Sequence, residues 1–252
     1  MSTHCVSHTS CPKCRSLGHD RSGDNLAVYS DGSKYCFRCG YVETASGIQR
    51  LQRGSEPNHQ PTGKAITLPS DADGVLGVRG REFLHKYALT ERDCQVNMIM
   101  WSDFYKRLIF PYFDSTGLVG WQGRYLGEQP DKAKWFSQGD LKTLMHKVGN
   151  PHSKVCVVVE DIISAIKVSH DPRVCVVPLF GSHISMTKAL QLKKICDKLL
   201  IWLDKDVQSK AVKYSHTAQS IGLQSHNIIT DKDPKSYNDS EISEILNAVA
   251  IN

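Results

Sequence analysis

Four carboxylates near the ends of apolar runs have the residue types and spacing of a divalent-cation site. Glu160 directly follows one β-rich run, Asp204 and Asp206 follow a second, and Asp233 comes after a third. Carboxylate oxygens are ligands that Mg²⁺ accepts, usually with substrate phosphates completing its coordination. If the chain stays extended after the second run, the i, i+2 spacing directs Asp204 and Asp206 to one side. We therefore predict that Glu160, Asp204, Asp206 and Asp233 bind Mg²⁺ or Mn²⁺.

The nine cysteines are concentrated near the N-terminus, where five fall within the first 39 residues. Cys11 and Cys14 form one CxxC pair, Cys36 and Cys39 form a second, and 21 residues separate the pairs. Two such pairs supply four thiolates, the closed tetrahedral set that structural Zn²⁺ prefers. A segment this small and polar needs such a crosslink to fold. We predict one structural zinc ion here, with two unrelated thiol pairs as the alternative.

The elements that must position the carboxylates lie in the last hundred residues, where short Val, Ile and Leu runs alternate with helical patterns. The predicted strands are 154–159, 174–178, 199–203 and 225–229, and the predicted helices are 162–169, 186–198, 209–221 and 240–249. This alternation predicts an α/β fold with a mainly parallel sheet that helices cover on both faces. Since active sites of such sheets lie at the carboxyl ends of the strands, the sheet would gather the carboxylates at one edge.

The middle of the chain has the signals of short helices and a β-hairpin. Residues 81–87 have helical spacing, and Thr90 with Asp93 can cap a second short helix. The runs 108–113 and 118–124 are β-rich, and the Asp-Ser-Thr-Gly between them suits a four-residue turn. Ahead of these elements, Gly, Pro and polar residues predict a flexible linker. The predicted divisions of the chain are 1–43, 44–74 (the linker), 75–153 and 154–252.

The composition is that of a globular chain. Of 252 residues, 31 are Lys or Arg and 26 are Asp or Glu, which gives a net charge of +5, and 40% are apolar. The longest apolar run, 174–180, contains a proline and is far shorter than the roughly 20 residues of a membrane helix. No signal-peptide core precedes the first cysteines, so we expect a cytoplasmic location with reduced thiols. The small net charge is compatible with a nucleic-acid partner and does not require one.

The order of these features resembles a phage DNA primase related to the bacterial replicative primases. Val157-Val-Val-Glu160 before a helix, and later Leu200-Ile-Trp-Leu-Asp-Lys-Asp206, are similar to the TOPRIM fold of primases, topoisomerases and some nucleases. An N-terminal Cys₄ ribbon and the stretch from Arg107-Leu-Ile-Phe-Pro to Gly120-Trp-Gln-Gly-Arg124 come before it. The resemblance implies a zinc-binding ribbon (1–43) joined by the linker to an α+β RNA-polymerase domain. That domain would consist of an N-terminal subdomain (75–153) and a TOPRIM subdomain with a C-terminal helix (154–252).

The activity that the resemblance implies is DNA-directed RNA synthesis, in which short primers are made on single-stranded DNA during replication. Glu160, Asp204 and Asp206 would be the catalytic carboxylates. Triphosphates are strongly anionic, so cations must surround the site, and the candidates are Arg107, Arg124, Lys134 and Lys106. The implied partners are a single-stranded DNA template, ribonucleoside triphosphates and a separate replicative helicase, because the sequence has no GxxxxGK[ST] motor loop. No membrane partner is implied, and for a phage protein the location would be the host cytoplasm.

Three alternatives stay open at this point. Asp161 either replaces an acid of the family's Glu-Gly-x-x-Asp motif or caps the helix that follows it. A RecR-like recombination mediator also joins a Cys₄ module to a TOPRIM domain, but that family carries helix-hairpin-helix sequence ahead of the module, where this sequence has ten residues. A TOPRIM nuclease would use the same carboxylates for hydrolysis without needing the Gly-Trp-x-Gly-Arg hairpin. Primer synthesis is therefore the function that we expect.

Overall fold

The chain divides into two compact units, residues 1–64 and 65–252, which are described separately. The computed structural model describes residues 4–20, 22–36, 38–39, 41–43 and 66–249. Most of the predicted linker, 44–65, lies outside the described residues. Its last part, 66–74, belongs to the larger unit, where Asp73 forms a β-bridge with Trp101.

The small unit is a four-stranded antiparallel sheet with one short helix. Its strands β1 (Cys5–Thr9), β2 (Leu26–Tyr29), β3 (Lys34–Cys36) and β4 (Val42–Glu43) lie in chain order, and α1 (Pro12–Ser16) follows β1. The buried side chains of this unit are few: Leu26 packs with three of the cysteine thiols. So little apolar area stabilises a fold weakly, and the thiols are therefore central to the stability of this unit.

The larger unit begins with two helices and a meander of antiparallel strands. The helices are α2 (Val78–Lys86) and α3 (Glu91–Val96), and the strands, in sheet order, are β5 (Met100–Ser102), β6 (Arg107–Asp114), β7 (Gly117–Tyr125) and β8 (Trp135–Gln138). The predicted Thr90–Asp93 capping box is present at the start of α3. The hairpin turn is tighter than predicted, because Asp114 pairs with Gly117 and leaves a two-residue loop.

A glycine allows β7 and β8 to pair closely. A Cβ atom at Gly120 would lie 2.8 Å from the carbonyl oxygen of Gln138 and still closer to the side chain of Leu141. Any other residue would therefore push β8 away from β7. The close pairing brings Trp135 opposite Arg124 across the two strands.

The second sheet of the larger unit confirms the predicted parallel arrangement. Its order is β13 (Gln224–Asn227), β12 (Lys198–Ile201), β10 (Val155–Val159), β11 (Cys175–Pro178) and β9 (Val148–Gly149), and only the two-residue edge strand β9 is antiparallel. The helices α4 (Ile162–Val168), α5 (Met186–Ile195), α6 (Ser209–Ser220) and α7 (Asp239–Ala248) also agree with the sequence prediction to within a few residues. Two 3₁₀ turns, Lys205–Val207 and Pro234–Ser236, were not predicted.

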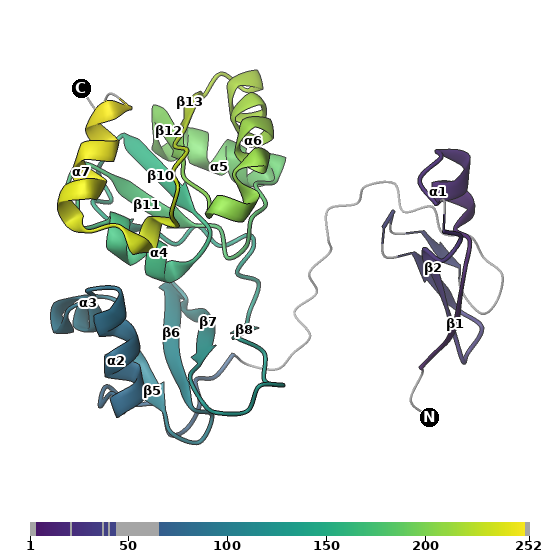
Figure 1. Ribbon diagram of the computed structural model, residues 1–252, viewed down its shortest axis with the longest axis horizontal. Coiled ribbons are helices and arrows are strands. Elements are labelled where there is room, and N and C mark those ends of the chain that lie inside the picture. Colours follow the sequence, from purple (N-terminus) through teal and green to yellow (C-terminus); the bar gives the residue numbers. More distant parts are fainter. Residues whose placement is uncertain (1–3, 21, 37, 40, 44–65, 250–252) are drawn as a thin grey trace. The chain divides into compact units, whose positions relative to one another are not determined.

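Alternating side chains of the central strand β10 face two different cores. Val157 and Val159 pack on the side of α4 and α7, whereas Cys156 and Val158 pack on the side of α5 and α6. Figure 1 shows these helix pairs on opposite faces of the sheet. Burial on both faces explains why the parallel strands are continuous apolar runs in the sequence.

One buried cluster connects the meander to the parallel sheet. It extends from Leu84 in α2 through Phe110 in β6 and Val157 in β10 to Ile242 in α7. The side chain of His170 joins the same parts. One ring nitrogen lies 3.0 Å from Asp93 in the first turn of α3, and the other lies 3.0 Å from Asp239 at the start of α7. None of the helices in the described part of the chain is long and apolar enough to cross a membrane.

Candidate functional site

The four predicted zinc ligands are gathered in the small unit. The sulfur atoms of Cys11 and Cys39 are 3.6 Å apart, those of Cys14 and Cys36 are 3.7 Å apart, and all four lie within 4.8 Å of one another. Tetrahedral zinc with Zn–S bonds of about 2.3 Å requires S–S separations of about 3.8 Å. The spacing and the four-thiol chemistry therefore fit a structural zinc ion.

Main-chain groups favour the ionised form of one thiol of this cluster, whereas burial raises the pKa values of Cys11 and Cys14. Burial would raise the pKa of the Cys36 thiol, but main-chain N–H groups of Cys39 and Arg38 outweigh it and lower that pKa to about 7. Asp20 supports the first CxxC pair, because its Oδ2 accepts hydrogen bonds from the Cys11 N–H at 2.6 Å and from the Ser10 hydroxyl at 3.2 Å. The sequence analysis missed Asp20, which has no motif and is found only through the fold.

Glu160 and Asp204 come together at the carboxyl edge of the parallel sheet. Glu160 directly follows β10, and its Oε1 accepts a hydrogen bond from the main-chain N–H of Asp204 at 3.1 Å. Burial, and then the negative charge of Asp204, raise the pKa of Glu160 to about 7. Burial also raises the pKa of Asp204, although Lys235 opposes that shift. Two carboxyl groups that resist ionisation so close together form a site that a cation would stabilise.

The prediction of an extended conformation after Asp204 is wrong. Residues Lys205–Val207 form a 3₁₀ turn, so Asp206 does not share one side of a strand with Asp204, and it is exposed. Asp206 is nevertheless close enough to Glu160 for its charge to raise the pKa of Glu160. The turn was missed because a short 3₁₀ segment has no distinctive hydrophobic pattern.

Lys235 is a residue of this edge to which the sequence assigned no role. Its ammonium group lies 2.7 Å from Asp204, 3.1 Å from Asp161 and 3.2 Å from Asp233, and its side chain is 15% exposed. Asp161 has two roles: Oδ1 accepts the N–H of Ser164 as the cap of α4, and Oδ2 accepts from Lys235. The helix-cap alternative for Asp161 is therefore confirmed, together with an ion pair that was not expected.

A cavity of about 480 Å³ connects these acids with basic and aromatic side chains of the meander. Arg124 of β7 lies across from them, with its guanidinium 5.1 Å from the ring of Phe83 and 5.5 Å from that of Trp135. The Nε atom of Arg124 is buried without a hydrogen-bond partner. Lys134 lines the same cavity and is exposed. Two of the four predicted phosphate-binding cations therefore face the carboxylates.

The other two predicted cations line a different cavity. The guanidinium of Arg107 donates to the carbonyl oxygens of Gly123 at 2.8 Å and Ala133 at 2.9 Å. Lys106 pairs with Asp103 at 2.9 Å and is half exposed. In this arrangement Arg107 holds the loop between β7 and β8 in place, which helps position Lys134.

One observation in particular indicates that the carboxylate edge fits a divalent cation. Oδ1 of Asp204 is buried and has no hydrogen-bond partner. An unpaired buried oxygen costs free energy, and a bound cation would remove that cost. Within the described residues, however, only the four cysteines bring three or more ligand groups within 4.8 Å of one another. The four predicted metal ligands are thus neighbours, but no three of them bring their carboxylate oxygens within 4.8 Å of one another: Glu160, Asp204, Asp206 and Asp233.

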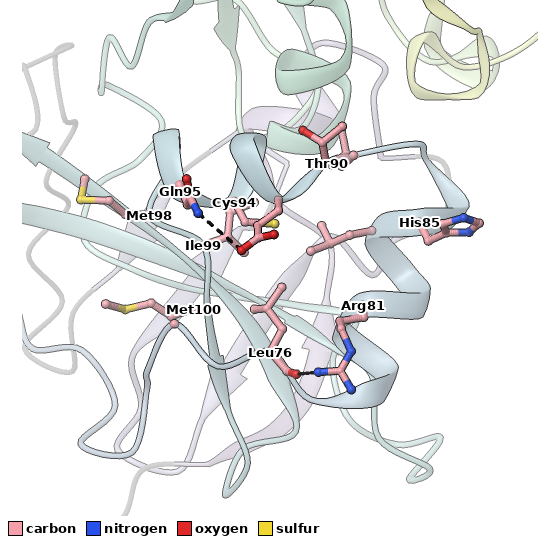
Figure 2. A pocket seen from close by; sticks show the side chains of 13 residues that line it. Leu76, Arg81, His85, Thr90, Cys94, Gln95, Met98, Ile99 and Met100 are labelled. Atoms are coloured by element: carbon pink, nitrogen blue, oxygen red, sulfur yellow. Dashed lines mark hydrogen bonds between the residues drawn. The ribbon is translucent and has the colours of Figure 1, made fainter.

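Another cavity of the larger unit is lined mostly by apolar side chains. This cavity of about 690 Å³ is enclosed by α2, α3 and the start of β5 (Figure 2). Figure 2 shows Leu76 and Arg81 joined by a hydrogen bond at its rim, and Glu91, which Gln95 contacts at 3.5 Å, is the single carboxylate of its lining. One carboxylate offers little to a metal or a triphosphate, so the smaller acid-lined cavity is the candidate site.

No protein-family model and no curated protein matches the sequence. Solved structures do match the fold. The zinc-binding and RNA polymerase domains of the Aquifex aeolicus primase align over 98% of this chain and 80% of theirs, with a TM-score of 0.56 and 14% identity. The primase fragment of the bacteriophage T7 primase-helicase aligns over 97% and 99%, with a TM-score of 0.51 and 16% identity. The E. coli primase catalytic core aligns over 68% and 71%, with a TM-score of 0.55 and 16% identity.

The Aquifex and T7 matches cover nearly the whole chain, including the small unit that holds the four-cysteine cluster. The chain therefore has the fold of the bacterial and phage DnaG-type primases, in which a small four-cysteine unit is followed by a mixed α/β domain.

Proposed function

We propose that this protein is a DNA primase, which joins ribonucleotides into short RNA primers on a single-stranded DNA template. The observation that supports this most directly is the cavity in which Glu160 and Asp204 face Arg124 and Lys134. Such a cavity suits a triphosphate, which needs cations for its phosphates and carboxylates for its metal ions. The primase fold, including its zinc-binding unit, is the context in which we interpret it.

Glu160, Asp204 and Asp206 would hold Mg²⁺ or Mn²⁺. The ion would lower the pKa of the attacking 3′-hydroxyl and neutralise charge on the leaving pyrophosphate. Around it, Glu160 must be ionised to bind, and the approach of a cation favours its ionised form. The main-chain N–H of Asp204 already orients the Glu160 carboxylate. No protein nucleophile is required, because the attacking group belongs to the nucleotide.

Arg124 and Lys134 would bind the phosphates of the incoming nucleotide. The Nε of Arg124 is buried without a hydrogen-bond partner, and its guanidinium lies near the rings of Phe83 and Trp135 in the cavity lining. An arginine so placed can contact two phosphate oxygens at once. Lys134, which is exposed, adds a mobile point charge at the rim.

The template would be single-stranded DNA, as in the solved structure of a DnaG primase catalytic domain bound to ssDNA, which matches this fold with a TM-score of 0.54. The zinc-binding unit is proposed to take part in binding the template. We propose a replicative helicase as the partner that unwinds the duplex. We propose that the protein acts in DNA replication in the cytoplasm. If it comes from a phage, this is the cytoplasm of the host cell.

The test is primer synthesis by the full chain on single-stranded DNA with Mg²⁺ and labelled ribonucleotides. We expect short RNA products, and Asp204→Asn should reduce their rate at least about 100-fold, because an amide binds cations far less well than a carboxylate. Asp197→Asn is the matched control, since Asp197 precedes β12 at the opposite end of the same strand and is exposed. It should leave the rate unchanged.

Two other results would contradict the proposal. Nicked DNA without RNA products would indicate a TOPRIM nuclease, which uses the same carboxylates for hydrolysis. DNA binding without any turnover would indicate a RecR-like mediator. An Asp204→Asn variant that is folded and fully active would remove the carboxylate edge from the mechanism.

A further inference from the structure

The position of Lys235 limits how many metal ions the carboxylate edge can hold. Its ammonium group donates hydrogen bonds to Oδ2 of Asp204 and Oδ2 of Asp161 and forms an ion pair with Oδ2 of Asp233. Three aspartate carboxylates therefore surround this one ammonium group. With 15% of its side chain exposed, it is part of the site and not a surface charge that happens to lie nearby.

A metal ion cannot share those three oxygen atoms with the ammonium. Mg²⁺ binds carboxylate oxygens at about 2.1 Å, so an ion bound to all three would occupy nearly the place where the nitrogen lies. The nitrogen is 2.7 to 3.2 Å from the same atoms. Two cations so close together in a half-buried site would repel strongly. A metal could bind there only by expelling the lysine from its three partners.

The acceptors that Lys235 leaves free form a second set. Asp204 gives one oxygen to the lysine, and its other oxygen, Oδ1, is buried without a partner. Glu160 is held beside it by the N–H of Asp204, and the charge of Asp206 reaches Glu160. The carboxylates thus form two sets. Asp161 and Asp233 contact the lysine, and Glu160 and Asp206 are available to a metal. Asp204 belongs to both sets.

We propose that Lys235 is a built-in cation that takes one cation position of the site, so that the protein alone binds one divalent ion, at Glu160, Asp204 and Asp206. This inference rests on the proposed metal-dependent function and specifies it. Asp233 then holds Lys235 and is not a metal ligand. Any further divalent ion that the reaction uses must arrive bound to the nucleoside triphosphate.

The experiment counts Mn²⁺ ions bound to the zinc-loaded full chain, from the electron paramagnetic resonance signal of free Mn²⁺, without nucleotide. Wild type should bind about one Mn²⁺ per chain, and Lys235→Met should bind about two. Lys235→Gln is polar, uncharged and one bond shorter than lysine, and it serves where the methionine variant is unstable. It should also bind about two. Asp204→Asn, which removes the shared ligand, should bind none at the same concentrations.

Lys232→Met is the matched control. Lys232 is three residues away on the same loop, is exposed, and contacts the ring of Tyr237 instead of the aspartates. It loses the same charge, so a count that stays at about one shows that position matters and not net charge.

Two Mn²⁺ ions on the wild-type chain, or one ion on both folded Lys235 variants, would overturn the inference. The count is independent of primer synthesis. A wild-type chain that binds one Mn²⁺ but makes no RNA would contradict the proposed function alone, and one that makes RNA but binds two ions would contradict only this inference.

Discussion

The chemistry of the carboxylate edge depends on single side chains whose charges conflict in the absence of metal. Glu160 is the clearest case, because burial and the charge of Asp204 raise its pKa from 4.5 to about 7. When folded, the group favours its neutral form. Its contribution to stability is therefore present below about pH 4.5 and is lost as the pH rises through 7. The site is destabilised at neutral pH until a cation binds.

Glu160→Gln should consequently stabilise the metal-free protein at pH 8. An amide never ionises, so the variant escapes a cost of about 1 to 2 kcal/mol, which is the pKa shift reduced for partial exposure. At pH 4.5 the two proteins should unfold at nearly the same urea concentration. The measurement is urea unfolding of zinc-loaded protein at both pH values without added Mg²⁺. Glu82→Gln in α2, an exposed position, should show no such difference.

The result that would count against this account is a Glu160→Gln variant whose stability differs from wild type equally at both pH values. The motif at Glu160 could be predicted because a carboxylate after a buried strand is visible in sequence. The pairing with Lys235 could not, because a lysine between acidic residues has the pattern of a solvated loop. Its burial results from three loops meeting at one edge.

At the scale of elements, the paired strands β7 and β8 supply the basic wall of the candidate site. The guanidinium of Arg124 lies 5.1 Å from the ring of Phe83 in α2 and 5.5 Å from the ring of Trp135 in β8. Three elements thus contribute to the position of one proposed phosphate-binding group. Preorganisation of this kind reduces the entropy that the side chain loses when it binds an anion.

Arg124→Lys should therefore weaken nucleotide binding even though it keeps the charge. A lysine cannot stack between the two rings or contact two phosphate oxygens in one plane, which should raise KM for ribonucleotides about tenfold. The measurement is steady-state extension of a preformed primer. Arg92→Lys, at an exposed position in α3, controls for the substitution itself. An unchanged KM in Arg124→Lys would remove Arg124 from the nucleotide site.

The elements themselves were largely predictable. Strands β10 to β13 and helices α4 to α7 follow from apolar runs and helical spacing, since both faces of a parallel sheet are buried. Strand β8 was missed because its sequence, Trp-Phe-Ser-Gln, is short and mixed, and β9 because it has two residues. Such strands form because of the strands beside them, and the sequence shows no local sign of that.

At the scale of the whole molecule, the two units depend on different forces. The larger unit has extensive apolar cores, whereas the small one buries little beyond Leu26 and its thiols. A zinc ion bound by the four cysteines would supply much of the folding free energy of the small unit. The sequence predicted this division from cysteine spacing, and the boundaries proposed for the individual domains stay a prediction.

Chelation of zinc should abolish the folded small unit and leave the larger one intact. We expect one zinc per chain by a colorimetric chelator assay, and a calorimetric scan in which only the small unit's transition disappears on chelation. Cys14→Ser should purify without stoichiometric zinc, while Cys5→Ser, at an exposed position in β1, should retain it. Stoichiometric zinc in Cys14→Ser, or loss of the larger unit's transition on chelation, would refute this division.

The buried cluster from α2 to α7 and the contacts of His170 with Asp93 and Asp239 have a consequence for hydrogen exchange. Main-chain amides become accessible to solvent only as fast as the cooperative unit that contains them opens. Because β6 and β10 share one core, their amides should belong to a single slowest-exchanging class, although one strand lies in the meander and the other in the parallel sheet. The basic wall and the acidic edge would then persist or be lost together, as two sides of one structure.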